Sequence, residues 1–300
     1  MAATLVHGAT SLPSDHRCDF GKHPRIVLET GHPIAPRVEI WQCSVCRHGV
    51  TRPAMEDVSP LYANRASEDY LARDGKAVQI LKMYVFRRLA RSLLKFASAP
   101  VLKVSDYGTG SGMLANAFVK EAGPGTAVYA FDFFDDPPEQ MLGVEYRSFA
   151  DSKTLRGQID LLTCFHVLEH SDNSDAMLTE LQSYLRPGGT LVVEVPNVDC
   201  VWTPWFGKYC ANWYAPYHRV HFSRQSLRRL IQSHGLEIVA DQDICGPTFA
   251  LSLAALLGMR PNSGLFAVAL MLRPFQWAAE RLSHRPSALR VIARKPRTHE

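Results

Sequence analysis

The feature that most constrains this chain is the alternation of apolar runs with helical stretches from about residue 100 onward. The apolar runs 101–107 and 127–133 are separated by 113–122, in which apolar residues recur at helical spacing. Strands that alternate with helices form a parallel sheet covered on both faces. We therefore expect a doubly wound α/β domain.

The sequence is expected to divide into two units. Residues 1–64 are rich in His, Pro and Cys and lack a sustained helical period, which predicts a small, loop-rich N-terminal module. Residues 65–300 are expected to form the α/β domain, beginning with a helix between Ser67 and Phe96. A chain of 300 residues, 46% of them hydrophobic, is long enough for both units.

The composition and the N-terminal sequence limit which binding partners and which cellular location are expected. The net charge of +4 is not gathered into a basic tract, so no nucleic-acid partner is expected. The N-terminus lacks a secretory signal pattern, which favours a cytoplasmic location in which the seven cysteines are thiols or metal ligands. The apolar stretches within 247–285 are shorter than the ~20 residues of a membrane span. They predict a helical cap over the core, with peripheral contact to a membrane surface as the alternative.

A glycine loop follows the first predicted strand of this domain. It reads D-x-G-x-G-x-G from Asp106 to Gly112 and opens directly into a helix, whose free N–H groups and flexible backbone favour a close approach to a ligand. The next strand ends at Asp132, about 20 residues later, where an acid binds ribose hydroxyls. The spacing differs from the nicotinamide fingerprint G-x-G-x-x-G, so a nicotinamide oxidoreductase is disfavoured.

With these motifs the chain resembles the class I S-adenosylmethionine-dependent methyltransferases over residues 100–240. The resemblance implies a Rossmann-like fold with a mostly parallel seven-stranded sheet. It also implies S-adenosyl-L-methionine as cofactor, with Asp132 at the ribose and Asp151 near the adenine. The residues implied to hold the methionine part of the cofactor are Asp106, Gly108, Gly110 and Gly112.

Candidate catalytic residues follow the predicted strand 159–165 in the motif HxxEH. A hydroxyl acceptor needs a base, and on a helical turn His166 and His170 would share a face beside Glu169. His170 is a candidate base or substrate contact, with a structural histidine as the alternative, and His218 is a second candidate base. Two imidazoles and a carboxylate also suit a divalent metal. The motif is similar to the ExxEH metal motif of small-RNA 2′-O-methyltransferases, with His166 in place of the first glutamate.

Residues 197–222 carry an unusual density of rings. We expect an aromatic lid that binds a ring or sugar and excludes water, although packing against the sheet accounts for some of the rings. The ring-bearing residues are Trp202, Trp205, Phe206, Tyr209, Trp213, Tyr214, Tyr217, His218 and His221.

The N-terminal module contains a C-x₂-C pair, Cys43 and Cys46, with Cys18 upstream. Such spacing is typical of zinc sites. The segment resembles the zinc-binding domain that precedes the catalytic domain of sugar C-methyltransferases, except that Gly21 stands where that family has a second pair. A structural Zn²⁺ with His48 as fourth ligand is the prediction. His16, His23 and a metal-free relic of the module are the alternatives.

Together these features predict a methyltransferase that acts on a small-molecule or glycan acceptor, most readily at oxygen. C-methylation of a sugar-like substrate is the alternative reaction. A cofactor-binding scaffold without catalysis is the alternative that is not an enzyme.

Overall fold

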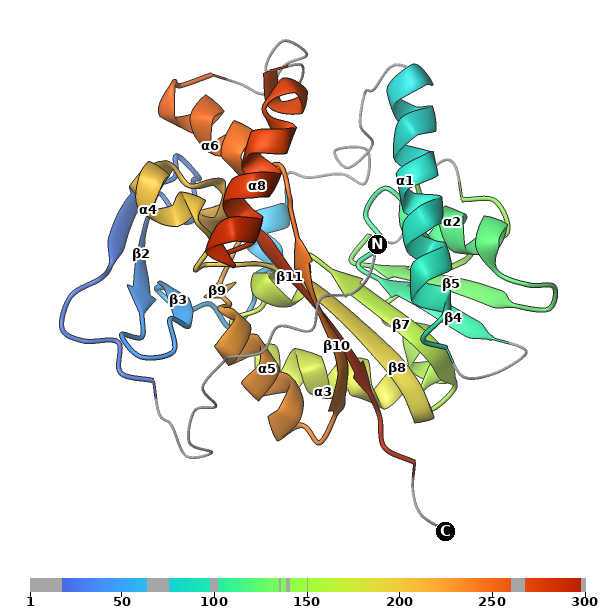
Figure 1. Cartoon of the computed structure of the whole chain (residues 1–300). Coiled ribbons are helices and arrows are strands. Elements are labelled where there is room, and N and C mark those ends of the chain that lie inside the picture. Colours follow the sequence, from blue (N-terminus) through green and yellow to red (C-terminus); the bar gives the residue numbers. More distant parts are fainter. Residues whose placement is uncertain are drawn as a thin grey trace.

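The computed structural model describes residues 18–63, 76–97, 102–134, 136–138, 141–149, 151–259 and 268–297. Its larger sheet has seven strands in the order β10-β11-β8-β7-β4-β5-β6. Neighbours from β8 to β6 are parallel, and β11 runs antiparallel to both β8 and β10. The doubly wound, mostly parallel sheet is therefore confirmed (Figure 1). The strands are β4 (Lys103–Tyr107), β5 (Ala127–Asp132), β6 (Glu145–Ser148), β7 (Ile159–Phe165), β8 (Leu185–Pro196), β10 (Glu237–Ile244) and β11 (Ala288–Arg294).

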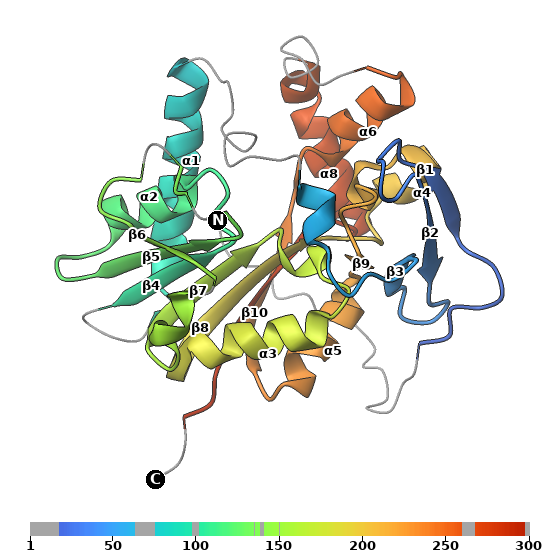
Figure 2. The same ribbon diagram turned by 180° about the vertical axis from the view of Figure 1, so that it is seen from behind.

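Helices cover both faces of this sheet, because successive residues of a strand point to opposite sides. On one face α1 (Lys76–Leu94) and α2 (Met113–Glu121) bury Leu93 and Phe118 against Leu161. On the other face lie α3 (Ser174–Tyr184) and α5 (Arg224–Ser233), as Figures 1 and 2 show. Of the predicted first helix, residues 67–75 lie outside the described residues.

A second sheet joins the N-terminal segment to the α/β domain. Its order is β1 (Ile26–Glu29), β2 (Arg37–Gln42), β3 (Gly49–Arg52) and β9 (Val220–His221). The first three strands come from the predicted N-terminal module, whereas β9 belongs to the segment predicted as an aromatic lid. The two units thus share one sheet.

Arg219, just before β9, strengthens this junction. Its guanidinium is fully buried, and its Nε donates to Asp172 at 2.8 Å. It also donates to the carbonyl oxygens of Thr51 and Pro53 in the N-terminal segment. A buried arginine is stable only when its donors are satisfied, so the N-terminal segment and the domain depend on each other here.

The predicted apolar cap contains α6 (Thr248–Leu256) and α8 (Arg273–Ser283). Both pack on α4 (Trp202–Phe206), where the ring of Trp202 lies 4.8 Å from Phe249 and 6.2 Å from Phe275. Residues 260–267 of the cap lie outside the described residues. Within the described ranges, no helix is both long and apolar enough to cross a membrane.

Candidate functional site

A cavity of about 640 Å³ lies at the carboxyl ends of β4, β5, β7 and β8. This edge is where ligands bind in open α/β sheets. One end is formed by Gly108, Gly110 and Asp132, and another part of the wall by His170 and His218. The remaining wall is largely apolar and includes Phe133, Phe149, Val167, Met177, Tyr214 and Leu251.

The glycine loop turns its backbone toward the cavity. Gly108 has φ +72°, and a Cβ on it would lie 2.2 Å from Cγ2 of Val167. Gly110, with φ +53°, donates its N–H to Oδ2 of Asp132 at 2.7 Å. The left-handed backbone and the close contact both require glycine at position 108. The loop is therefore held against the end of β5.

Asp132 and Asp106 have different environments. Asp132 lines the cavity, and its Oδ1 also accepts the N–H of Phe133 at 2.7 Å. Asp106 is buried beneath the loop, where it accepts hydrogen bonds from Thr163 (2.7 Å) and Thr109 (2.9 Å). Burial raises the pKa of Asp106 to about 6, although both hydrogen bonds oppose the shift. In this arrangement Asp106 anchors the loop from below.

The two other predicted cofactor residues also lie outside the described cavity lining. Gly112 caps α2 with φ +71°. Asp151 begins a 3₁₀ helix (Asp151–Leu155) and accepts a hydrogen bond from Ser148 at 2.9 Å. The neighbouring Phe149 lines the cavity.

The HxxEH motif does not form the expected helical turn. His166 has φ +56°, and only Leu168–His170 are helical, as a 3₁₀ turn. Nε2 of His166 lies 3.2 Å from Glu194, and its Nδ1 lies 3.5 Å from Glu169. Burial lowers the pKa of His166, but the two carboxylates outweigh it and raise that pKa to about 10. A protonated imidazole cannot serve as a base at neutral pH.

Glu169, His170 and His218 come together at the cavity. One ligand-type atom from each lies within 4.8 Å of the others, although His218 is 48 residues beyond His170. Nδ1 of His218 donates to the carbonyl oxygen of Asn212 at 2.9 Å. Burial lowers the pKa of His218 to about 4, so its ring is neutral at pH 7 with Nε2 unprotonated. The structure thus groups three of the four predicted catalytic side chains and directs His166 to Glu194.

Tyr62 is a cavity residue that the sequence reasoning missed. It ends the 3₁₀ helix Ser59–Tyr62 in the N-terminal segment, and its hydroxyl lies 2.6 Å from Nδ1 of His170. Its ring lies 5.5 Å from Tyr217 and 6.3 Å from Phe133. No motif surrounds Tyr62, and its partner is 108 residues away, so only the fold identifies it.

Part of the segment 197–222 lines the cavity, as a lid would, and part of it packs in the protein core. Tyr214 and His218 line the cavity. Trp202 and Trp213 are buried in a core cluster with Ile40 of β2, whereas Trp205 is 68% exposed. Trp202, Phe206 and Trp213 therefore pack in the core, whereas Tyr214 and His218 face the cavity.

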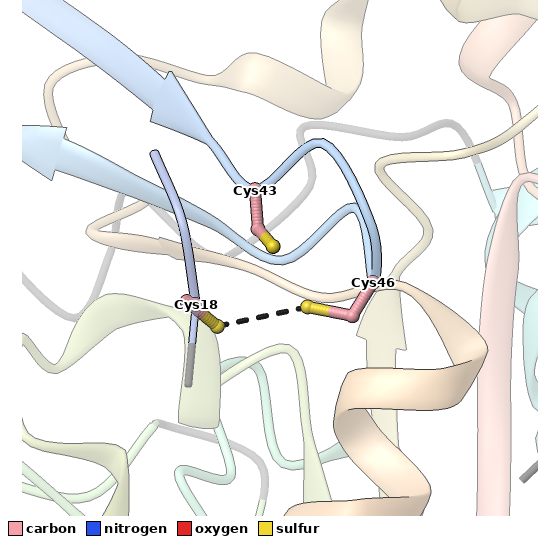
Figure 3. Close-up of side chains that lie close together, drawn as sticks. All are labelled: Cys18, Cys43 and Cys46. Atoms are coloured by element: carbon pink, nitrogen blue, oxygen red, sulfur yellow. Dashed lines mark hydrogen bonds between the residues drawn. The ribbon is translucent and has the colours of Figure 1, made fainter. Parts of the chain in front are cut away.

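Three of the four predicted zinc ligands converge. The sulfur atoms of Cys18, Cys43 and Cys46 point toward one another, with 3.6 Å between those of Cys18 and Cys46 (Figure 3). Tetrahedral thiolate ligands of zinc are about 3.8 Å apart, so the three residues fit this ion. His48 is not in the group, because its ring packs edge-on against Phe222 at 5.7 Å. His23 is exposed, and His16 lies outside the described residues.

Comparisons with known proteins identify a family and several relatives of this chain. The profile of a family described as "Methyltransferase domain" matches residues 81–241. The ubiquinone/menaquinone biosynthesis C-methyltransferase UbiE of Cupriavidus pinatubonensis is 29% identical over 175 residues, which cover 47% of this chain and 69% of the relative. The ubiquinone biosynthesis O-methyltransferase of Acinetobacter baylyi is 28% identical over 107 residues, covering 32% and 44% of the two chains.

Among solved structures, phosphoethanolamine N-methyltransferase 2 of Haemonchus contortus, in complex with S-adenosyl-L-methionine, shares the fold. Its TM-score is 0.50 at 13% identity, with 77% of this chain and 60% of that chain covered.

Proposed function

Because this chain belongs to the methyltransferase-domain family and is an S-adenosylmethionine-dependent methyltransferase, we propose that it methylates a hydroxyl oxygen of a small, largely apolar acceptor. The observation that carries the proposal is the cavity itself. It joins the glycine loop and Asp132 to the imidazoles of His170 and His218 through a mostly apolar wall.

The cofactor would be held by the glycine-loop end of this cavity. The backbone of Gly108 and Gly110 would bind the methionine part, and the carboxylate of Asp132 would accept the ribose hydroxyls. Asp106 would act indirectly by fixing Thr109, and Asp151 would lie near the adenine. When bound, the cofactor supplies an electrophilic methyl group on sulfur.

The acceptor would lie against the imidazoles. A hydroxyl is a weak nucleophile, so its proton must be removed as the new bond to the methyl carbon forms. His218 suits this role, because its Nδ1–H is held by Asn212 and its Nε2 is available as a base. His170 and Tyr62 would orient the acceptor, and the apolar wall would exclude water.

The apolar wall favours a ring-bearing alcohol or phenol over a glycan, which would leave many hydroxyl groups without partners. The relatives named for ubiquinone biosynthesis support an acceptor of this chemical class. The UbiE relatives are named as C-methyltransferases, so methylation at a ring carbon is the second candidate.

The test is a methylation assay with S-adenosylmethionine carrying a ¹³C-methyl group and a panel of phenols, hydroquinols and sugars. The carbon chemical shift of the product separates a methyl ether from a C-methyl group. His218→Asn should lower kcat about 10²–10⁴-fold while cofactor affinity stays unchanged. A kcat of His218→Asn equal to that of the wild type would refute the role of His218 as the base. Binding of the cofactor without methyl transfer to any acceptor would favour the alternative of a cofactor-binding scaffold without catalysis.

We also propose that Cys18, Cys43 and Cys46 bind a structural zinc ion. The turn that carries Cys46 is tied to the α/β domain, because Ser223 Oγ donates to the Cys46 carbonyl oxygen at 2.6 Å. Metal analysis of the purified protein should find one zinc per chain, and Cys43→Ser with Cys46→Ser should release it. A wild-type protein without zinc would refute the proposal.

A further inference from the structure

The carboxylate of Glu169 is the most unusual buried group in the cavity region. Its side chain is 1% exposed, and within the described part of the chain neither carboxylate oxygen has a hydrogen-bond donor. Its Oε1 lies 3.5 Å from Nδ1 of His166 and 3.8 Å from Nε2 of His218. A buried carboxylate without hydrogen bonds is costly unless positive charge lies beside it, and the imidazolium of His166 is shared with Glu194, to which it lies closer.

The geometry around Glu169 suits a cation better than a direct ion pair. Ligand atoms about 2.1 Å from a metal ion lie about 3.0–3.5 Å from one another. The Glu169–His218 separation of 3.8 Å and the group limit of 4.8 Å are within a small side-chain adjustment of this spacing. Direct hydrogen bonds would need distances near 2.8 Å.

The imidazoles of His218 and His170 each face a backbone carbonyl oxygen that can hold the ring in place. Nδ1 of His218 faces the carbonyl oxygen of Asn212 at 2.9 Å, and Nδ1 of His170 faces that of Tyr217 at 3.1 Å. A backbone carbonyl that accepts Nδ1–H directs Nε2 outward as a ligand, which is the usual support of metal-binding histidines. The Tyr62 hydroxyl also lies within hydrogen-bond distance of Nδ1 of His170, at 2.6 Å.

We infer that Glu169, His170 and His218 form a site for a divalent transition-metal ion at the acceptor end of the cavity. The set differs from HxxEH, because His166 lies against Glu194 and the distant His218 takes its place. The inference rests on the proposed function, but in it Nε2 of His218 binds the ion instead of acting as the direct base. The ion would bind the acceptor oxygen, and the hydroxyl proton would pass to solvent before methyl transfer.

The test is direct titration of chelator-treated full-length protein with Mn²⁺, followed by electron paramagnetic resonance. Mn²⁺ prefers nitrogen and oxygen ligands to thiolates, so it distinguishes this site from the three cysteines. We expect one Mn²⁺ per chain, bound about 100-fold more weakly in Glu169→Gln and in His218→Asn.

His284→Asn is the matched control. It changes an exposed imidazole outside the cavity lining, and its left-handed backbone (φ +54°) tolerates asparagine. This variant should bind Mn²⁺ as the wild type does. Retained binding of S-adenosylhomocysteine verifies that each variant is folded.

Absence of Mn²⁺ binding by the wild type, or unchanged binding in Glu169→Gln, would overturn the inference. Methyl transfer that persists in chelator would also overturn it, and would leave the proposed function intact with His218 as direct base. Mn²⁺ binding without methylation of any acceptor would support the metal site while contradicting the proposed function.

Discussion

Replacement of Gly108 by alanine tests how the glycine loop is held. Position 108 has φ +72°, which costs a residue with a Cβ about 1–2 kcal/mol. The new Cβ would also meet Val167 Cγ2 at 2.2 Å, an overlap that requires a shift worth about 1–3 kcal/mol. We expect Gly108→Ala to lower the free energy of unfolding by about 2–5 kcal/mol.

Gly157 separates the two costs. It has nearly the same backbone conformation, φ +71°, and a Cβ there would meet no atom within 4 Å. Gly157→Ala should therefore show the backbone cost alone. Val167→Ala combined with Gly108→Ala should recover the part of the loss that comes from the overlap, as a double-mutant cycle measures.

The assay is urea unfolding of the four variants, with calorimetric titration of S-adenosylmethionine on each. Val167 lines the cavity, so its displacement by the methyl group added in Gly108→Ala should also weaken cofactor binding. A loss in Gly108→Ala no larger than that in Gly157→Ala would refute the reasoning. So would additive effects of the changes at 108 and 167.

Three further predictions follow from single side chains. Asp132→Asn replaces one acceptor oxygen by a donor and should weaken cofactor binding by about 1–3 kcal/mol in calorimetry; unchanged affinity would mean that this acid does not bind the ribose. Arg219→Met leaves the half-buried carboxylate of Asp172 without its cation. It should lower the free energy of unfolding in urea by about 3–5 kcal/mol. A loss below about 1 kcal/mol would show that Arg219 is not needed to join the N-terminal segment to the α/β domain. The raised pKa of Asp106 means that the folded protein holds this proton more tightly than the unfolded chain, so the stability it contributes is complete below about pH 4 and is lost as the pH rises through about 6. Asp106→Asn should remove this pH dependence, and equal pH slopes in the two proteins would contradict it.

Local sequence was sufficient to predict how the glycine loop and Asp132 come together at one end of the cavity. A strand, a glycine loop and a helix are consecutive in the chain, so their spacing alone places Gly108, Gly110 and the end of β5 at one edge of the sheet. The direction of Asp106 was not predictable in the same way. Its partner Thr163 lies 57 residues away on β7, and only the pairing of β4 with β7 brings them together.

The part of the cavity around His170 and His218 depends on residues that are farther apart in the sequence. The expected shared face of His166 and His170 required a regular helix, and the positive φ of His166 prevents it. Tyr62 and His218 reach His170 from opposite directions in the sequence, through the strand pair β3–β9. No periodicity or short motif in the sequence predicts such a contact.

The pairing of β3 with β9 has a consequence for how this protein can be recombined. A chimera that exchanges residues 1–64 alone would set a foreign strand against native Val220 and His221 and would replace Tyr62 at the same time. Stability and acceptor preference would change together in such a hybrid. Exchange of the N-terminal segment would therefore require matching changes around residue 220.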